Sequence, residues 1–396
     1  MKVRVRQGDS FWYYSQLFQI PLTLVIDSNS NVQPDRLFIG QYVSIPGYVI
    51  NNYRFKRGDS FYKVARERGL NTDALLLINQ GLNPQNIPVG TLINVPQRVT
   101  RPVVNGNRPY DVSTYMNELN QLLEIYPFIK KTSIGETVLG NTIQELRIGT
   151  GAKRVHWNGS FHANEWITTP VIMTFLNDYL LALTNQSSIR GLQMAPFYSQ
   201  VTLSVVPMVN PDGVDLVLNG PPEKEPYKTN VVTINNGSLD FSDWKANIRG
   251  VDLNNQFPVM WEIEKERKPK QPAPRDYPGE RPLSEAESLA MANLTRKRDF
   301  TWVLAFHTQG EVIYWGFENR EPPYAETIVE EFERVSGYEP IMTVESYAGY
   351  KDWFIYEWGR PGYTVELGKG VNPLPLSQFD EIYQESLGIF LASLYM

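Results

Sequence analysis

The stretch Val155-His156-Trp157-Asn158-Gly159-Ser160-Phe161-His162-Ala163-Asn164-Glu165 joins an apolar, strand-like segment to two side chains of the kinds that bind metal ions. A His and a Glu three residues apart at a turn can point both side chains at one cation, and Zn²⁺ accepts nitrogen and oxygen ligands. A third ligand has few sources, because the chain holds only 3 histidines. His156 lies within the apolar strand, where a core or surface role is expected, whereas His307 ends a second apolar run, residues 301–306. We therefore predict a zinc site of His162, Glu165 and His307.

The composition is that of a globular protein with more than one domain. The chain has 396 residues, of which 42% are hydrophobic and 20% charged, with a net charge of −6; this length predicts two or three domains. Residues 1–97 hold 10 Lys and Arg against 6 Asp and Glu, a balance of +4 that leaves −10 for the rest. A mildly basic front end favours an anionic polymer as partner, but no basic cluster is dense enough to indicate nucleic acid.

The cysteine count and the apolar segments bear on the chemistry and on the cellular location. The chain has 0 cysteines, which excludes disulfides and cysteine catalysis and leaves only nitrogen and oxygen ligands for zinc. The N-terminus lacks the apolar core and cleavage site of a signal peptide, and no apolar run approaches the ~20 residues that span a bilayer. We expect no membrane span and no ordinary export, with action from the cytoplasm or a sporulating-cell compartment of a bacterium.

An internal repeat fills the first hundred residues at an offset of 50 without gaps. Gly8-Asp9-Ser10-Phe11 returns as Gly58-Asp59-Ser60-Phe61, and Ile45-Pro46 returns as Val95-Pro96. Each copy begins with an alternating strand and continues through a Gly-Asp-Ser turn that can cap a helix. The second copy has helical patterns at 62–68 and 72–79 and a Pro-Gly punctuated return strand at 90–96. Each copy is thus predicted to be a strand, two helices and a strand.

Both copies resemble the LysM domain, a small βααβ module that binds N-acetylglucosamine-containing glycans. We place the copies at residues 1–47 and 50–97, followed by a polar, proline-bearing linker at 98–109. In the first copy, Asp27-Ser28-Asn29-Ser30-Asn31 stands where an Asn-rich loop is usual, which leaves the glycan affinity of this copy open. A duplicated packing domain without a ligand is the alternative interpretation.

Strands and helices alternate from Tyr110 onward, which predicts one α/β domain at residues 110–396 with a mixed sheet. Helical patterns at 111–126 and 170–183 alternate with strand patterns at 141–148, 154–158 and 201–207. Ligands of such folds bind at the carboxyl ends of strands. The predicted zinc ligands follow residues 154–158 and 301–306, and so fall at such ends.

Four further motifs accompany the zinc residues along the chain. These are a tight turn at Asn210-Pro211-Asp212-Gly213, a loop and strand at 244–258, a Gly-rich aromatic loop at 346–353 and a strand at 363–367 that carries Glu366. Together with H-x-x-E and H-[ST]-x-G, the motifs N-P-D-G, R-G-V-D-L-N and T-x-E-L resemble those of the zinc carboxypeptidase family over residues 110–396. The resemblance implies a mixed eight-stranded sheet flanked by helices and one Zn²⁺ held by His162, Glu165 and His307.

The family resemblance also implies roles for residues beside the metal. Glu366 is similar to the general base, which takes a proton from water and passes it to the leaving nitrogen. Arg249 resembles the electrophile that stabilises the developing oxyanion, with Lys245 as the competing alignment. Tyr347 is the best match for the family's mobile tyrosine. Taken alone, each of these would most often be a surface or salt-bridge residue, so the prediction depends on their occurring together in order.

One departure from the family redirects the expected substrate. Zinc carboxypeptidases carry Asn-Arg where this chain has Asn254-Asn255, and an asparagine cannot grip a terminal carboxylate as the bidentate arginine does. Lys351 stands at the position that faces the side-chain pocket, where a lysine would favour an acidic group such as the second carboxylate of meso-diaminopimelate; a surface lysine is the alternative. With its glycan-binding repeats, the chain is similar to γ-D-glutamyl-L-diamino acid endopeptidases, which cut peptidoglycan stem peptides.

Three other functions remain open at this point. An amidohydrolase of small acylated amino acids and a carboxypeptidase on other substrates share the motifs, although the LysM pair speaks against the amidohydrolase. A wall-binding protein with an inactive peptidase domain is the alternative from another class. Metal content and digestion of defined stem peptides distinguish these functions.

Overall fold

A computed structural model describes residues 1–396 and divides them into two compact units. The first unit comprises Met1–Val103, Glu118–Lys130 and Asn177–Ala195. The second comprises Val104–Asn117, Lys131–Leu176 and Pro196–Met396. The first unit therefore includes short pieces of the region that we assigned to the α/β domain.

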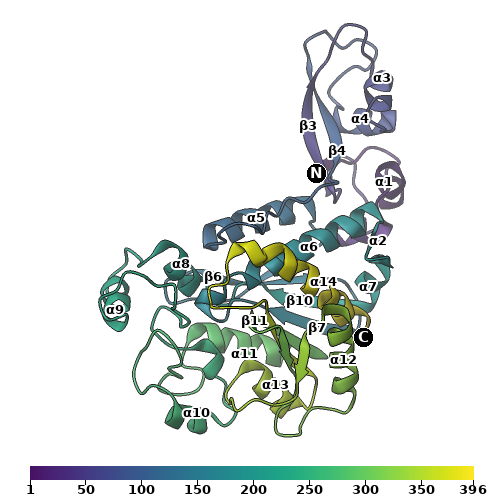
Figure 1. The fold of residues 1–396 in the computed structure, drawn as a ribbon. Coiled ribbons are helices and arrows are strands. Elements are labelled where there is room, and N and C mark those ends of the chain that lie inside the picture. Colours follow the sequence, from purple (N-terminus) through teal and green to yellow (C-terminus); the bar gives the residue numbers. More distant parts are fainter. The chain divides into compact units, whose positions relative to one another are not determined.

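Each repeat folds into two strands and two helices in the predicted order (Figure 1). The first repeat has β1 (Lys2–Arg4), α1 (Phe11–Phe18), α2 (Leu22–Asp27) and β2 (Tyr42–Ser44). The second has β3 (Tyr48–Arg54), α3 (Phe61–Arg66), α4 (Thr72–Ile78) and β4 (Leu92–Arg98). In each pair the strands run antiparallel. The repeated serine caps the first helix of each copy, because Ser10 Oγ accepts from Tyr13 N and Ser60 Oγ accepts from Lys63 N, both at 3.1 Å.

The loop at residues 27–31 of the first repeat forms the same buried hydrogen bonds as the corresponding loop of the second repeat. Asn29 Nδ2 donates to Val25 O and Ser44 O, each at 2.8 Å, and Asn29 Oδ1 accepts from Ser44 N at 2.7 Å. Fifty residues on, Asn79 makes the same three contacts with Leu75 and Asn94. The changed residues around Asn29 therefore leave the framework of the repeat intact.

The second unit is built on a sheet of eight strands in the order β13-β12-β14-β11-β7-β10-β6-β5. Their bounds are β5 (Lys130–Glu136), β6 (Thr142–Ile148), β7 (Lys153–Asn158), β10 (Val201–Val206), β11 (Trp302–Thr308), β12 (Val312–Tyr314), β13 (Glu339–Ile341) and β14 (Gly362–Leu367). The central strands β10, β7, β11 and β14 are parallel, while β6 and β12 pair antiparallel with their neighbours. The predicted mixed eight-stranded sheet is confirmed.

The remaining elements of the chain are mostly helices. The helices are α5 (Val112–Ile125), α6 (Thr168–Asn185), α7 (Ala195–Gln200), α8 (Pro211–Asn219), α9 (Tyr227–Ile234), α10 (Trp261–Arg267), α11 (Ala286–Arg298), α12 (Tyr324–Ser336), α13 (Tyr350–Trp358) and α14 (Phe379–Tyr395). Three 3₁₀ turns, η1 (Ala163–Glu165), η2 (Leu253–Asn255) and η3 (Leu376–Gln378), and a short hairpin, β8 (Ser188–Ile189) and β9 (Leu192–Gln193), complete the set.

Successive residues of β7 face opposite layers of helices, as the period of a strand requires. Trp157 packs against Phe175 of α6 and Phe390 of α14, with ring centroids 5.3 and 4.9 Å away. The preceding His156 points to the other face, where it stacks on Phe300 at 4.5 Å and meets Tyr350 of α13. His156 is fully buried, and burial lowers its pKa to about 3, so it is a neutral core histidine.

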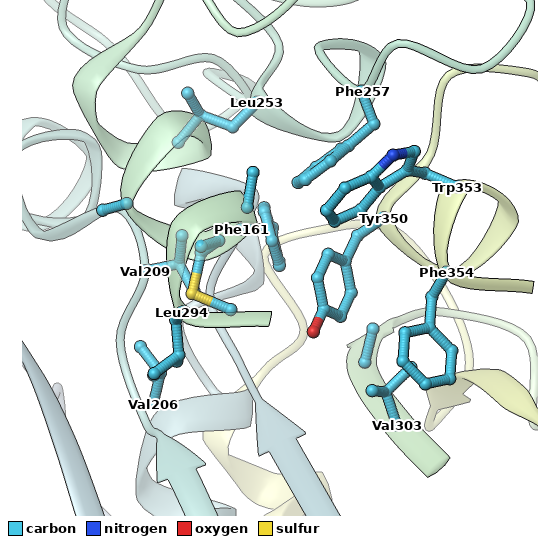
Figure 2. Close-up of a cluster of buried hydrophobic side chains, with 14 of the residues drawn as sticks. Phe161, Val206, Val209, Leu253, Phe257, Leu294, Val303, Tyr350, Trp353 and Phe354 are labelled. Atoms are coloured by element: carbon cyan, nitrogen blue, oxygen red, sulfur yellow. The ribbon is translucent and has the colours of Figure 1, made fainter. Parts of the chain in front are cut away.

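An aromatic core lies on this second face (Figure 2). Phe257 stacks on Trp353 at 5.3 Å and meets Phe161 edge-on at 6.1 Å. Phe161 also stacks on His307 at 6.1 Å and directly precedes His162 in the chain. Since buried aromatic packing resists displacement, this core fixes the backbone on which the predicted metal ligands stand.

Two predicted loops are in fact helix starts. Asn210 caps α8, because its Oδ1 accepts from Gly213 N at 3.1 Å and Pro211 occupies the first turn. The Gly-rich segment 346–353 enters α13 at Tyr350, and Lys351 and Asp352 are each only 5% exposed. The segment 244–258 forms η2 and no strand.

One segment, Ala163–Asn185, matches a membrane span in length and apolar composition, contrary to our expectation that none would. Of its most apolar window, 83% is buried inside the protein. A buried core helix passes the same test.

Candidate active site

Three parallel strands bring the predicted residues to one edge of the sheet. β7 ends at Asn158, and the turn that follows leads into η1, which carries Glu165. β11 pairs with β7, and His307 is the second-last residue of β11. On its other side β11 pairs with β14, where His307 lies opposite Glu366. Residues more than 140 positions apart therefore meet because neighbouring parallel strands end at the same edge.

The three predicted metal ligands converge on one point. His162 Nδ1 lies 2.8 Å from Glu165 Oε1, His307 Nδ1 lies 2.9 Å from Glu165 Oε2, and the two Nδ1 atoms are 3.1 Å apart. Each side chain is no more than 6% exposed. Thr308 N also donates to Glu165 Oε2 at 3.3 Å, which orients the carboxylate.

The donor set fits a zinc ion. Zinc holds nitrogen and oxygen ligands at ~2.0–2.2 Å, so ligands in a tetrahedral site stand roughly 3.3 Å apart. The observed separations of 2.8, 2.9 and 3.1 Å need only small shifts to reach this value. Two imidazoles and one carboxylate leave a fourth position for water or substrate, which is the ligand count of catalytic rather than structural zinc sites.

Asp252 extends the cluster beyond the metal ligands. Its Oδ1 lies 3.2 Å from His162 Nε2, and its Oδ2 lies 3.0 Å from Lys245 Nζ. Asp252 is completely buried. A carboxylate on the outer nitrogen of a ligand histidine fixes the ring and its tautomer, and here the same carboxylate also anchors Lys245. Our sequence reasoning assigned Asp252 no role, although it lies in the R-G-V-D motif.

Lys245 and Arg249, the two candidates for the electrophile, occupy different surroundings. Lys245 touches Asp252 and, at 3.5 Å, Asp276, and its side chain keeps 19% of its surface exposed. Burial opposes its charge, but Asp252 and Glu165 outweigh burial and raise the pKa of Lys245. Arg249 is half exposed, lies 3.7 Å from Glu285 and lines a separate cavity of about 560 Å³. The structure thus brings Lys245, and not Arg249, to the cluster.

The charges of the cluster shift the pKa of its acids and bases. Burial opposes a charge on His162, but Glu165 and Asp252 raise its pKa to about 9. Burial likewise disfavours the Glu165 carboxylate, yet the two histidines hold its pKa well below the usual range. Burial, followed by the charge of Glu165, raises the pKa of Glu366 to about 8. Glu366 is thus poised to hold a proton beside the histidine pair.

Two of the predicted substrate-binding residues, Asn254 and Lys351, already have partners within the protein. Asn254 Oδ1 accepts from Tyr350 N at 2.9 Å and so ties η2 to the start of α13. Asn255 is 7% exposed. Lys351 Nζ lies 2.5 Å from Asp352 Oδ1 and donates to Gly316 O at 2.9 Å. Lys351 therefore already has a carboxylate partner, which a substrate carboxylate would have to displace.

Tyr347 lies apart from the metal ligands. Its ring meets Phe317 edge-on at 6.3 Å and lies under the Arg267 guanidinium at 5.5 Å. Its backbone N donates to Glu264 Oε1 at 2.6 Å, and the residue lines a cavity of about 350 Å³. The structure gives Tyr347 no hydrogen bond or ring contact with His162, Glu165 or His307.

Comparison with known protein families finds the same two parts. The zinc carboxypeptidase family model matches residues 115–388, and the LysM domain model matches residues 3–46 and 53–96. Gamma-D-glutamyl-L-diamino acid endopeptidase 1 of Lysinibacillus sphaericus is 60% identical over 396 residues, covering 100% of both chains. An uncharacterised protein of Bacillus subtilis (strain 168) is 46% identical over 290 residues, which are 72% of this chain and 77% of the relative.

Solved structures agree on the fold. Bovine thrombin-activatable fibrinolysis inhibitor, in complex with a tick carboxypeptidase inhibitor, superposes with a TM-score of 0.55 at 19% identity, covering 73% of this chain and 97% of that one. At this identity the likeness establishes the architecture of the catalytic unit.

Proposed function

Because the chain belongs to the zinc carboxypeptidase family and carries two LysM domains, we propose that it hydrolyses the γ-D-glutamyl–meso-diaminopimelate bond of peptidoglycan stem peptides. The observation that carries this proposal is 60% identity, over the full length of both chains, with an endopeptidase named for bonds between γ-D-glutamate and an L-diamino acid. The His-Glu-His cluster at the strand ends supports it, since a chain that had lost activity would not be expected to keep the complete donor set.

Zinc bound by His162, Glu165 and His307 would polarise the scissile carbonyl and lower the pKa of water to ~7. Glu366, opposite His307 across the strand pair, would accept the water proton on a carboxylate oxygen and pass it to the leaving nitrogen. A zinc ion bound beside Glu366 would lower the pKa of this carboxyl group from about 8. Glu366 would therefore be ionised at neutral pH.

Lys245 would stabilise the negative charge that develops on the carbonyl oxygen, a contribution typically worth ~3–4 kcal/mol. Its Nζ lies 3.0 Å from Asp252 Oδ2. Because this ion pair already positions the ammonium group, the Lys245 side chain need not be reordered during the reaction. Asp252 acts as a positioning residue, because it fixes both Lys245 and the His162 ring. We therefore propose Lys245 as the electrophile in place of Arg249, whose guanidinium lies 3.7 Å from Glu285.

The absence of an arginine at position 255 supports an endopeptidase rather than a carboxypeptidase. An asparagine that is 7% exposed offers no charge to a carboxylate next to the scissile bond. Carboxypeptidase action on ordinary peptides is therefore the second candidate.

The LysM pair supports binding to the glycan part of the wall. Six large apolar side chains are more than half exposed at matching positions of the two repeats: Trp12, Ile39 and Tyr42, with Tyr62, Val89 and Leu92 fifty residues later. Exposed apolar side chains at repeated positions are candidates for a ligand surface, and aromatic rings suit the apolar faces of sugars. The first repeat presents more aromatic area, which supports glycan binding by that copy as well. The two relatives that are 60% and 46% identical are both bacterial, so we place the reaction on wall or wall-derived peptides of a bacterium.

The test of the catalytic proposal uses the tripeptide L-Ala-γ-D-Glu-meso-diaminopimelate. The purified protein should contain one zinc per chain and release meso-diaminopimelate, and a chelator should stop the release until zinc is restored. Glu366→Gln should retain zinc and lose turnover. If the protein holds no stoichiometric metal, the alternative of a wall binder with an inactive domain is favoured. Full turnover by Glu366→Gln would remove Glu366 as the base.

A further inference from the structure

The first unit has a groove between the two repeats, with a volume of about 640 Å³. We call it the inter-repeat groove. Its lining includes the amides Gln16, Gln19 and Asn52 and the arginines Arg68 and Arg98. None of the six exposed apolar residues described above belongs to this lining, so the groove is a different surface from the one proposed for glycan. Its volume is that of a small-molecule site.

The walls of the groove are held together by contacts between the repeats. Arg6 of the first repeat makes two bonds to Asp73 of the second, at 2.9 and 2.6 Å, and Tyr13 donates to the same carboxylate at 2.5 Å. Arg98, from β4, donates to Phe18 O at 2.5 Å and to Gln19 O at 3.3 Å. A ligand would therefore meet a preformed site, which reduces the entropy lost on binding.

The groove carries positive charge and no carboxylate. Its lining contains two arginines and no Asp or Glu. Each arginine lies over a tyrosine of β3, with Arg68 4.4 Å from the centre of Tyr53 and Arg98 5.0 Å from that of Tyr48. The nearest carboxylate to Arg68 is Glu67, at 3.8 Å and half exposed, where solvent screens the pair. Arg68 Nη1 donates to Val64 O at 3.1 Å, which leaves Nε and Nη2 of this guanidinium for an anionic group.

Side-chain amides that form no hydrogen bond within the protein line the same groove. The side chains of Gln16, Gln19 and Asn52 make no hydrogen bond in the structure, whereas Asn51 and Gln97 are bonded to each other. A side-chain amide offers both donors and an acceptor. It therefore matches the N-acetyl and peptide groups of an acylated sugar, while an arginine matches a carboxylate.

We propose that the inter-repeat groove binds an N-acylated saccharide that bears a carboxylate, the chemistry of a muramyl peptide. The amides contact its acyl and peptide groups, and Arg68 contacts its carboxylate. The choice of a wall fragment as the source rests on the proposed function. The groove thereby recognises the junction of glycan and stem peptide, beside the repeats that hold the glycan.

Calorimetry on the full chain tests this proposal with N-acetylmuramyl-L-alanyl-D-isoglutamine as probe. We expect binding that weakens at least tenfold in Arg68→Gln and when the carboxylate of the probe is amidated. The matched control is Arg66→Gln, two residues away on α3, exposed and outside the groove, which should bind as the parent does. Asn52→Ala should weaken binding of the acidic and the amidated probe by the same factor. Thermal unfolding checks that each variant is folded.

The proposal is overturned if the parent protein does not bind the probe, if the amidated probe binds equally well, or if Arg66→Gln loses as much affinity as Arg68→Gln. A tetramer of N-acetylglucosamine provides the neutral comparison, and its binding should not change in Arg68→Gln. Equal loss of the tetramer would assign the groove to neutral glycan instead. Hydrolysis of the free tripeptide, measured in parallel on the parent protein, separates failure of this site from failure of the proposed catalytic function.

Discussion

Lys245 and Arg249 lie four residues apart, yet only one of them reaches the cluster. If Lys245 supplies the positive charge for the developing oxyanion, Lys245→Met should lower kcat about 10²- to 10³-fold, the usual loss when such a donor is removed. Arg249→Met should stay within about twofold, because its guanidinium lies with Glu285 on a half-exposed surface. Steady-state kinetics on the tripeptide decide between them. The reverse ranking would restore Arg249 as the electrophile.

Asp252 contacts the outer nitrogen of the zinc-ligand candidate His162, and this contact supports a second prediction. Asp252→Asn removes the charge that fixes the outer nitrogen of His162, so zinc affinity should fall by about 10- to 100-fold. Competition with a chromophoric chelator measures the affinity. Asp276→Asn is the matched control, because Asp276 contacts Lys245 but has no contact with His162. Equal zinc affinity in Asp252→Asn and the parent would show that His162 is positioned by packing alone.

Metal ligands are easier to predict from a sequence than the residues that support them. His162 and Glu165 stand out because histidine is scarce in this chain and the two are three positions apart. Asp252 lies in the R-G-V-D motif, but the motif does not reveal its contact with His162, which spans 90 residues and depends on the path of the intervening chain. The surroundings of Lys351 were equally hidden, because its partner Asp352 is its chain neighbour and gave no sign of a buried pair.

At the scale of elements, α11 contains a buried acid that makes stability depend on pH. Glu287 is fully buried and neither carboxylate oxygen has a hydrogen-bond partner. Burial, with the charges of Asp212 and Glu285, raises its pKa from 4.5 to about 8. Between these values the folded protein keeps a proton that the unfolded chain has released, so stability falls as pH rises through this window.

Glu287→Gln should therefore be more stable than the parent at pH 8 and no more stable at pH 5. Its urea midpoint should also vary less between these two values. Glu326→Gln, an exposed change on α12, serves as the control and should leave the pH dependence as it is. An unchanged difference between pH 5 and pH 8 in Glu287→Gln would show that another group is responsible.

Strands were predicted more accurately than the polar loops. The runs 141–148, 154–158 and 201–207 coincide with β6, β7 and β10 to within a residue or two. β10 is the clearest of them, because a buried parallel strand requires a continuous apolar run. Asn210-Pro211-Asp212-Gly213 and the segment 346–353 were assigned to turns and loops since Pro and Gly usually mark them. In the fold, Pro begins a helix and Gly349 precedes one, which only tertiary packing of the following residues decides.

At the scale of the whole molecule, two repeats with a matched exposed apolar surface accompany one catalytic unit. If this surface holds the wall, Trp12→Ala and Tyr62→Ala together should reduce sedimentation with insoluble peptidoglycan by about tenfold or more. The reason is that each removes an aromatic ring from matching positions of the two repeats. Leu239→Ala, an exposed apolar residue of the second unit, is the control. Undiminished sedimentation of the double variant would contradict this role of the repeats.

The bond that is cut distinguishes an endopeptidase from a carboxypeptidase. To identify this bond, the stem tetrapeptide L-Ala-γ-D-Glu-meso-diaminopimelyl-D-Ala is digested with the zinc-loaded protein and the products are identified by mass spectrometry. We expect L-Ala-D-Glu and meso-diaminopimelyl-D-Ala as the only products, neither of which forms with chelator or with Glu366→Gln. Release of free D-Ala, with the rest of the peptide intact, would contradict this expectation and identify a carboxypeptidase.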